Sequence, residues 1–159
     1  MGKILNRGGW TIWALPALAA AITGVSSRAN AASLLDSANT LYTASRFVEA
    51  IAVYKRAASM GENPALCYYN TGNAYFQIDS LPQAVVNYRL CVKAAPNYEK
   101  GFLNLAVVYY TLGDFGRAIW AAKQTLRLDP DLQKATLILA ASCRRVGDLP
   151  RAVAAFEDL

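Results

Sequence analysis

Histidine is missing from this chain of 159 residues, and its absence removes several kinds of chemistry. Without an imidazole there is no histidine general base, no histidine-dependent triad and no histidine-containing metal site. Cysteine is scarce, because only Cys67, Cys91 and Cys143 occur. Their spacing matches no zinc or redox motif, and three cysteines cannot all pair within one chain. We interpret them as small apolar core residues. A Cys67–Cys91 bridge is the alternative, since antiparallel helices would bring these two positions together.

Charge of one sign is also in short supply. Lys3, Arg7 and Arg28 precede a predicted cleavage site, and 13 basic and 11 acidic residues follow it. A nucleic-acid-binding domain usually has a stronger basic bias, so we expect no nucleic-acid partner. The acidic residues are scattered, and Asp114 and Asp148 are explained as helix caps. Because no Gly-rich phosphate loop is present either, we expect no enzymatic activity, no metal or other cofactor and no small-molecule substrate.

The chain has no apolar run long enough to cross a membrane comfortably. Its longest such run, Thr11–Val25, covers 15 residues, which at ~1.5 Å per residue falls short of the ~30 Å of hydrocarbon. Lys3 and Arg7 precede this run, and Ala29-Asn30-Ala31 follows it as an A-x-A cleavage site. We therefore predict that residues 1–31 are a signal peptide that meets the membrane only transiently. The mature protein would be exported, most simply to a bacterial periplasm; an uncleaved anchor is the alternative.

What the chain does contain is a repeat with a period of about 34 residues, and such a period marks stacked supersecondary units. Small residues at fixed offsets indicate that helices approach closely. The sequence therefore predicts an all-α solenoid. One series of small residues is Ala38, Gly72, Ala106 and Ala140; a second is Ala50, Ala84, Ala118 and Ala152; between them lie Leu41, Tyr75, Tyr109 and Cys143.

Each unit is predicted to be a helix, a short turn and a second helix. Gly113 allows a left-handed turn, and Ser80 and Asp114 are predicted to cap the second helices that follow them. Pro82 fits the first turn of its helix, where a missing N–H is tolerated. The predicted units cover about 32–64, 65–98, 99–132 and 133–159, the last being incomplete.

The second unit carries the most specific motif, Tyr68-Tyr69-Asn70-Thr71-Gly72-Asn73-Ala74-Tyr75, followed at the expected distances by Ala84, Tyr88 and Pro96. This pattern resembles the tetratricopeptide repeat (TPR) family. The third unit is similar, although Ala122 stands where an aromatic residue is common. The resemblance covers residues 32–159 and implies a right-handed superhelical solenoid of stacked antiparallel helix pairs.

The resemblance also implies that the first helix of each pair lines a concave groove that binds peptides. We therefore expect a non-catalytic module or scaffold that binds a peptide or partner protein, in an envelope complex. The candidate contact residues are the first-helix positions that packing does not require; a purely solvated face is the alternative. They are Asn39, Tyr42, Tyr69, Asn70, Asn73, Phe76, Lys100, Asn104, Tyr110, Lys134, Arg144 and Arg145.

Some family members hold a C-terminal carboxylate with a clamp of two Lys, two Asn and one Arg. On units two to four this chain keeps Asn73, Asn104 and Lys134, with Tyr69 and Ile138 in the other two places. On units one to three it keeps Asn39, Asn70 and Lys100, with Leu35 and Asn104 instead. Separately, Lys134, Arg144 and Arg145 could form a basic end to the groove, or the arginines could simply be the cationic last turn of a helix.

The chain ends inside the predicted fourth unit, where Val153, Phe156 and Leu159 would leave an apolar edge. A solenoid normally has terminal units with a polar outer face. The alternatives are a fragment of a longer chain, a covering partner (self-association included) or a frayed last helix. The layout is also similar to bacterial aerotolerance-operon repeat proteins. On that reading this chain is the N-terminal part of a larger envelope protein, whose activity lies beyond it.

Overall fold

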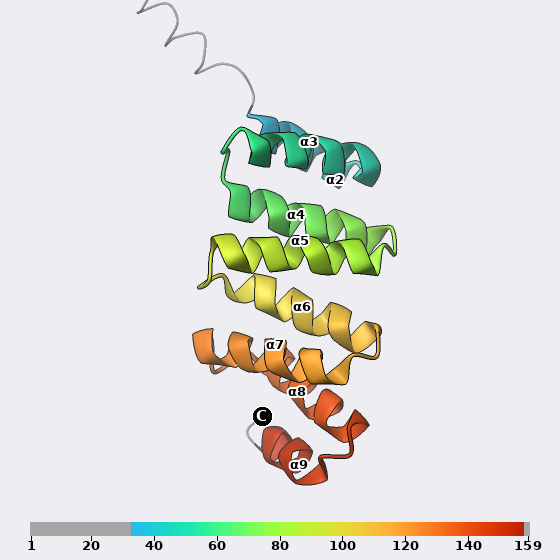
Figure 1. Cartoon of the computed structure of the whole chain (residues 1–159), viewed down its shortest axis with the longest axis vertical. Coiled ribbons are helices and arrows are strands. Elements are labelled where there is room, and N and C mark those ends of the chain that lie inside the picture. The colour runs from blue at the N-terminus through green and yellow to red at the C-terminus, as the bar shows by residue number, and fades with distance from the viewer. Residues whose placement is uncertain (1–32, 158–159) are drawn as a thin grey trace, which may run out of the picture. The chain divides into compact units, whose positions relative to one another are not determined.

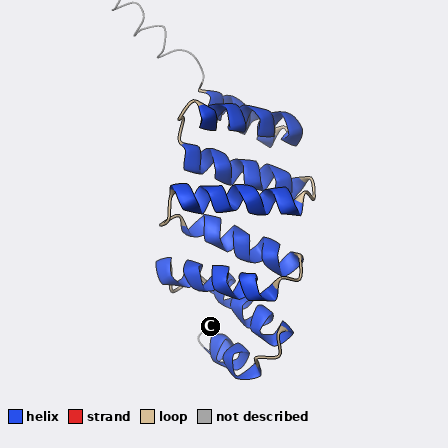
Figure 2. Ribbon diagram, viewed as in Figure 1, coloured by secondary structure: helices blue, strands red, loops and turns tan. Residues whose placement is uncertain are grey.

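A computed structural model describes residues 33–157, and the predicted signal peptide at 1–31 lies outside them. In the described part all regular secondary structure is helical and no strand is present (Figure 2), which confirms the predicted all-α class. Its helices are α2 (Leu34–Thr43), α3 (Phe47–Ser59), α4 (Pro64–Gln77), α5 (Leu81–Ala94), α6 (Glu99–Thr111), α7 (Phe115–Leu128), α8 (Gln133–Arg145) and α9 (Leu149–Glu157).

The helices follow one another in a stack (Figure 1). Each helix packs against the next one in the chain, and α6 also contacts α8. We call α2–α3, α4–α5, α6–α7 and α8–α9 units one to four, with α2, α4, α6 and α8 as the first helices. Because each unit touches only its neighbours, the described residues form a solenoid of helix pairs.

The turns inside the units share one backbone conformation. Ser45, Asp79, Gly113 and Gly147 recur at the repeat period, and their φ angles are 58°, 57°, 78° and 82°. Glycine adopts this left-handed conformation without strain, whereas Ser45 and Asp79 do so at a cost on the order of 1–2 kcal/mol. The left-handed turn predicted at Gly113 is confirmed.

Two of the predicted helix caps are confirmed and one is wrong. Asp114 Oδ1 accepts from the Arg117 N–H at 3.1 Å, and Asp148 Oδ1 accepts from the Arg151 N–H at 3.3 Å. Ser80 occupies the same position ahead of α5, but its side chain makes no capping hydrogen bond. Pro82 is not the reason, because Asp148 caps α9 with Pro150 at the same position. The two capping aspartates also pair with the arginine three residues on, Arg117 or Arg151, whereas Ser80 is followed there by Gln83.

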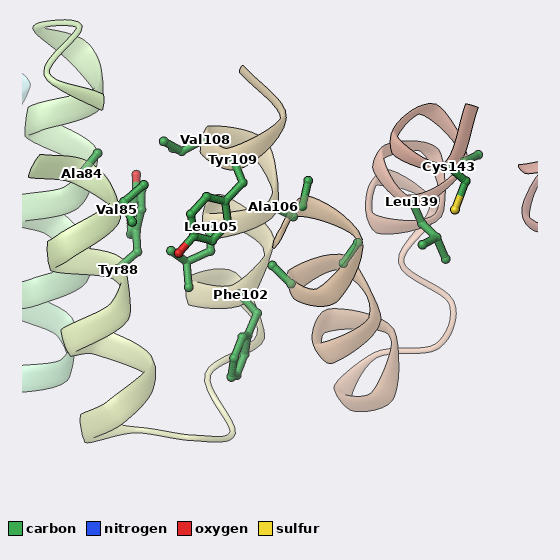
Figure 3. Close-up of a cluster of buried hydrophobic side chains, with 14 of the residues drawn as sticks. Ala84, Val85, Tyr88, Phe102, Leu105, Ala106, Val108, Tyr109, Leu139 and Cys143 are labelled. Atoms are coloured by element: carbon green, nitrogen blue, oxygen red, sulfur yellow. The ribbon is translucent and has the colours of Figure 1, made fainter. Parts of the chain in front are cut away.

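The core is made where small residues on one helix meet large ones on another. Ala38, Ala106 and Ala140 are fully buried, and Figure 3 shows the cluster that joins units two to four. At Gly72 an added Cβ would lie 2.6 Å from Cε1 of Tyr88, so only glycine lets this ring lie against α4. The close approach predicted from the repeat offsets is confirmed.

The cysteines are free and buried, which confirms their assignment to the core. The alternative Cys67–Cys91 bridge is not formed. The Cys67 thiol instead donates to the Glu62 carbonyl at 3.0 Å. Burial raises the pKa of Cys91 to about 11, and it raises the pKa of Cys67 and Cys143 as well. A thiolate is the reactive form, so these thiols are poor nucleophiles near neutral pH.

At the C-terminal edge, Leu149 and Val153 are exposed. The Phe156 side chain and Leu159 lie outside the described residues, so the predicted apolar edge is seen only in part. None of the helices from α2 to α9 has the length and apolar character that a membrane span needs.

Candidate functional site

The first helices of all four units meet at one pocket of about 210 Å³, which we call the central pocket. Since consecutive units repeat the same geometry, equivalent faces of α2, α4, α6 and α8 lie along one side of the stack. Only Tyr88 comes from a second helix. The lining residues are Tyr42, Asn73, Phe76, Gln77, Tyr88, Asn104, Val107, Val108 and Lys134.

Asn73 is the polar centre of the pocket. Its Oδ1 accepts from the Tyr88 hydroxyl at 2.8 Å and from Asn104 Nδ2 at 2.9 Å, so it ties α4 to both α5 and α6. Within residues 33–157, Asn73 Nδ2 and Asn104 Oδ1 make no hydrogen bond to protein. The pocket therefore offers a fixed donor and a fixed acceptor, the pair that an extended backbone can satisfy.

Lys134 supplies the positive charge of the pocket. Among the described residues it forms no ion pair, and no Asp or Glu lines the pocket. Its side chain is exposed. It also borders an adjoining apolar depression of about 190 Å³, formed with Tyr110, Leu137, Ile138 and Ala141. The Lys134 cation thus lies where the central pocket borders an apolar depression.

Asn39 and Asn70 form an equivalent network one unit earlier, outside the central pocket. Asn39 Oδ1 accepts from the Tyr54 hydroxyl at 2.7 Å and from Asn70 Nδ2 at 3.3 Å. Burial raises the pKa of Tyr54 to about 12 and that of Tyr88 further in the same direction. Both hydroxyls therefore remain protonated donors over the whole physiological range.

The structure separates the two possible registers of the carboxylate clamp. Asn73, Asn104 and Lys134 share the central pocket, whereas Lys100 is exposed and lies outside it. Asn39 and Asn70 do not line the pocket. Ile138 stands where the clamp has arginine, so the strong bidentate contact to a carboxylate has no donor there.

The other predicted contact residues are distributed as follows. Tyr42 and Phe76 line the pocket, and Phe76 is 38% exposed. Tyr69 instead packs into the core side, with ring centroids 6.0 Å from Tyr88 and 5.2 Å from Tyr98. Its aromatic ring therefore supports the pocket wall behind Tyr88.

Arg144 and Arg145 do not join Lys134 in a basic end of the groove. Lys134 lies in the first turn of α8 and the arginines in its last turn, about 15 Å away at the rise of an α-helix. Arg145 covers the Phe115 ring at 4.8 Å, and Tyr110 meets the same ring edge-on at 5.5 Å. This separation favours a cationic last turn over a single basic patch with Lys134.

Sequence reasoning missed three lining residues, namely Tyr88, Val107 and Val108, whereas Gln77 lies on the helix face predicted from Asn73 and Phe76. Val107 could have been found, because it lies one repeat period after Asn73 and on the next first helix. Tyr88 was assigned only to packing, although its hydroxyl reaches the pocket. Among the described residues, no group of three side chains suited to a metal ion is present.

Comparisons with known proteins agree with this architecture. The family model described as tetratricopeptide repeat matches residues 35–99 and 103–159. A crystal structure of MamA is 24% identical with a TM-score of 0.72, covering 79% of this chain and 73% of that one. The first TPR of Spaghetti (RPAP3), bound to the HSP90 peptide SRMEEVD, is 22% identical with a TM-score of 0.65. That match covers 72% of this chain and 90% of the other.

A third solved structure is the second TPR domain of human RPAP3 in complex with the HSP70 peptide SGPTIEEVD. It is 24% identical with a TM-score of 0.64, covering 69% of this chain and 92% of that one. At these identities the likeness shows the fold. No curated protein matches the chain.

Proposed function

Because the chain belongs to the tetratricopeptide repeat family, we propose that it is a non-catalytic interaction module that holds an extended segment of a partner protein in the central pocket. One observation carries the proposal: side chains from all four first helices meet at a single hollow with a free donor, a free acceptor and one cation. This arrangement suits a peptide better than a compact small molecule, because its polar groups are spread over several units.

The chemistry of the pocket defines the segment it fits. Asn73 Nδ2 and Asn104 Oδ1 would bind backbone C=O and N–H groups, each contributing about 0.5–1.5 kcal/mol. Lys134 favours a carboxylate at that point, and the depression beside it favours an apolar side chain next in the segment. The peptides bound by the RPAP3 domains, SRMEEVD and SGPTIEEVD, combine acidic and apolar residues in this way.

The partner is tested by placing a photo-crosslinking phenylalanine analogue at Phe76, which lines the pocket and is 38% exposed. The matched position is Val48, which is 69% exposed and lies outside the pocket. Cells of the native organism are irradiated, and products are identified by mass spectrometry. We expect discrete protein adducts at position 76 that do not form at position 48.

A second variant tests the chemistry of the contact. Lys134→Ala in the Phe76 crosslinking background should reduce the adducts several-fold. Lys100→Ala, an exposed first-helix lysine outside the pocket, should leave them unchanged. Equal adducts at positions 76 and 48, or equal loss with both lysine variants, would contradict a peptide site in the central pocket.

We also propose that the partner is part of a bacterial envelope complex, on the basis of the export signal predicted for residues 1–31. N-terminal sequencing of the protein isolated from its native cells tests this location. A chain that begins near Ala32 in the periplasmic fraction is the expected result. A chain that still begins at Met1 and stays in the cytoplasm would contradict it.

A further inference from the structure

The second helices α5 and α7 carry charges of one sign. The two helices contain Arg89, Lys93, Arg117, Lys123 and Arg127 and not one Asp or Glu. The residues after position 31 are nearly balanced overall, at 13 basic against 11 acidic. The helices α5 and α7 are therefore net positive, as is the first helix α8 through Lys134, Arg144 and Arg145.

On α5, two of these cations share one surface with exposed apolar side chains. Val86, Arg89, Leu90 and Lys93 occupy positions i, i+3, i+4 and i+7 of the helix, and together they line a shallow depression of about 350 Å³. Val86 is 55% exposed and Leu90 is 37% exposed. Tyr88, two residues from each, lies on the opposite side of α5 and lines the central pocket.

The next unit repeats the pattern with a tryptophan. Trp120, Lys123 and Arg127 lie one repeat period after Val86, Arg89 and Lys93, at the equivalent positions of α7. Because α5 and α7 are second helices of successive units (Figure 1), equivalent positions lie on the same outer side. Trp120 rests edge-on against the buried Phe102 ring at 5.9 Å and is still 48% exposed.

The cations of these two patterns have no carboxylate partner among the described residues. Every ion pair among the side chains described, those of residues 33–154, involves another arginine, namely Arg46, Arg117 or Arg151. Lys93 and Arg127 suit the negative ends of their helices, but this leaves their charge facing outward. We call Val86, Arg89, Leu90, Lys93, Trp120, Lys123 and Arg127 the α5–α7 face.

We propose that the α5–α7 face docks onto a membrane surface that contains anionic phospholipids. Lysine and arginine are attracted to anionic headgroups, while tryptophan and aliphatic side chains enter the boundary between headgroups and acyl chains. An acidic protein surface could bind the same side chains, but it would leave the chain without a response to lipid vesicles, which the experiment below measures. This surface lies opposite the central pocket, so membrane binding and peptide binding can occur together.

Trp120 provides a reporter for this contact in the full-length chain. The other two tryptophans, Trp10 and Trp13, are replaced by phenylalanine so that Trp120 alone emits. Vesicles containing phosphatidylglycerol should shift its emission to shorter wavelength, and lipids with brominated chains should quench it. Phosphatidylcholine vesicles should do neither, even where residues 1–31 attach the chain to them. High salt should weaken the effect.

Charge reversal tests the assignment of the surface. The Lys93→Glu/Lys123→Glu variant should weaken the Trp120 response at least tenfold, since each cation near an anionic surface contributes roughly a fivefold factor. The matched control is Lys100→Glu/Arg144→Glu, which reverses two exposed first-helix charges and should leave the response unchanged. Circular dichroism checks that both variants keep their helices.

Three results would overturn the proposal. One is unchanged Trp120 emission with phosphatidylglycerol vesicles, and another is equal weakening by both charge-reversal pairs. The third is a response to a single-stranded RNA oligomer without any response to vesicles, which would identify the surface as a polyanion site of another kind.

Discussion

The junctions between units one and two and between units two and three are polar, whereas the junction between units three and four is not. At the first two, a tyrosine hydroxyl and an asparagine amide both bind the Oδ1 atom of Asn39 or Asn73. At the third, the equivalent positions are Val107, Ala122 and Ile138. The same three offsets of one repeat are thus filled by hydrogen-bonding groups twice and by apolar groups once.

The difference shows how a repeat protein makes one of its units distinctive. An asparagine that accepts two hydrogen bonds fixes the spacing of three helices, because moving any of them breaks a bond. A valine, an alanine and an isoleucine fix it only by packing. The central pocket lies where the two kinds of junction meet, with Asn73 and Asn104 on its polar side and Val107 on its apolar side. Its character depends on this change in chemistry.

Removing the hydrogen-bond acceptor at Asn73 should give the largest loss of stability. Asn73→Ala leaves the Tyr88 hydroxyl and Asn104 Nδ2 without their partner, and each such loss costs about 1–3 kcal/mol. We expect the free energy of unfolding in urea to fall by about 2–4 kcal/mol. The matched change at the apolar junction, Val107→Ala, should cost about 1 kcal/mol. Equal costs for the two variants would remove the contrast between the junctions.

Adding a tyrosine to the apolar junction tests whether that junction can accept the side chain found at the polar ones. Ala122 is fully buried, so Ala122→Tyr should destabilise the protein by about 1–3 kcal/mol through overpacking. In unit two the equivalent tyrosine faces Gly72, whereas here it faces Ala106. Adding Ala106→Gly should therefore restore part of the loss, with a coupling of at least about 0.5 kcal/mol in a double-mutant cycle. Strict additivity would show that the two sites do not share one space.

Replacing Gly72, which makes room for the Tyr88 ring, should give the next largest loss of stability. In Gly72→Ala the new Cβ would lie 2.6 Å from Cε1 of Tyr88, so the buried ring must move. The gain in helix propensity offsets part of the strain, and we expect a net loss of about 1–2 kcal/mol in chemical denaturation. Gly116→Ala is the control, because a Cβ there has nothing within 4 Å. That variant should be stabilised by about 0.5–1 kcal/mol.

Much of this fold could be predicted from the sequence, because the repeat period records which positions must stay small and which must be large. Left-handed turns at Gly113 and caps at Asp114 and Asp148 follow from local backbone chemistry. The cap predicted at Ser80 is not formed: Asp114 and Asp148 each pair with an arginine three residues on, and Ser80 has Gln83 in that place. The site was harder to predict. The sequence grouped Asn39, Asn70 and Lys100 as readily as the set one repeat later. Only the three-dimensional arrangement shows that the later set, Asn73, Asn104 and Lys134, shares the central pocket.

The smallest expected change in the free energy of unfolding depends on pH and concerns only the two polar junctions, which contain tyrosine hydroxyls. Tyr54→Phe removes the hydroxyl that donates to Asn39 at 2.7 Å while keeping the buried ring. Near pH 8 this should cost about 1 kcal/mol. Burial raises the pKa of Tyr54 to about 12, above its usual value of about 10. The protonated hydroxyl is therefore favoured in the folded state. Its stabilisation is complete below pH 10 and is lost as the pH rises towards about 12.

The difference in unfolding free energy between the wild type and Tyr54→Phe should therefore narrow as the pH rises above 10. Urea denaturation from pH 8 to pH 11 measures this difference directly. Tyr88→Phe should behave in the same way, since burial raises the pKa of Tyr88 too. The third junction has Ala122 at this offset and no hydroxyl to ionise, so alkaline pH should weaken units one to three before it weakens the contact between units three and four. A difference that stays constant across this range would mean that the hydroxyl does not stabilise the junction through its proton.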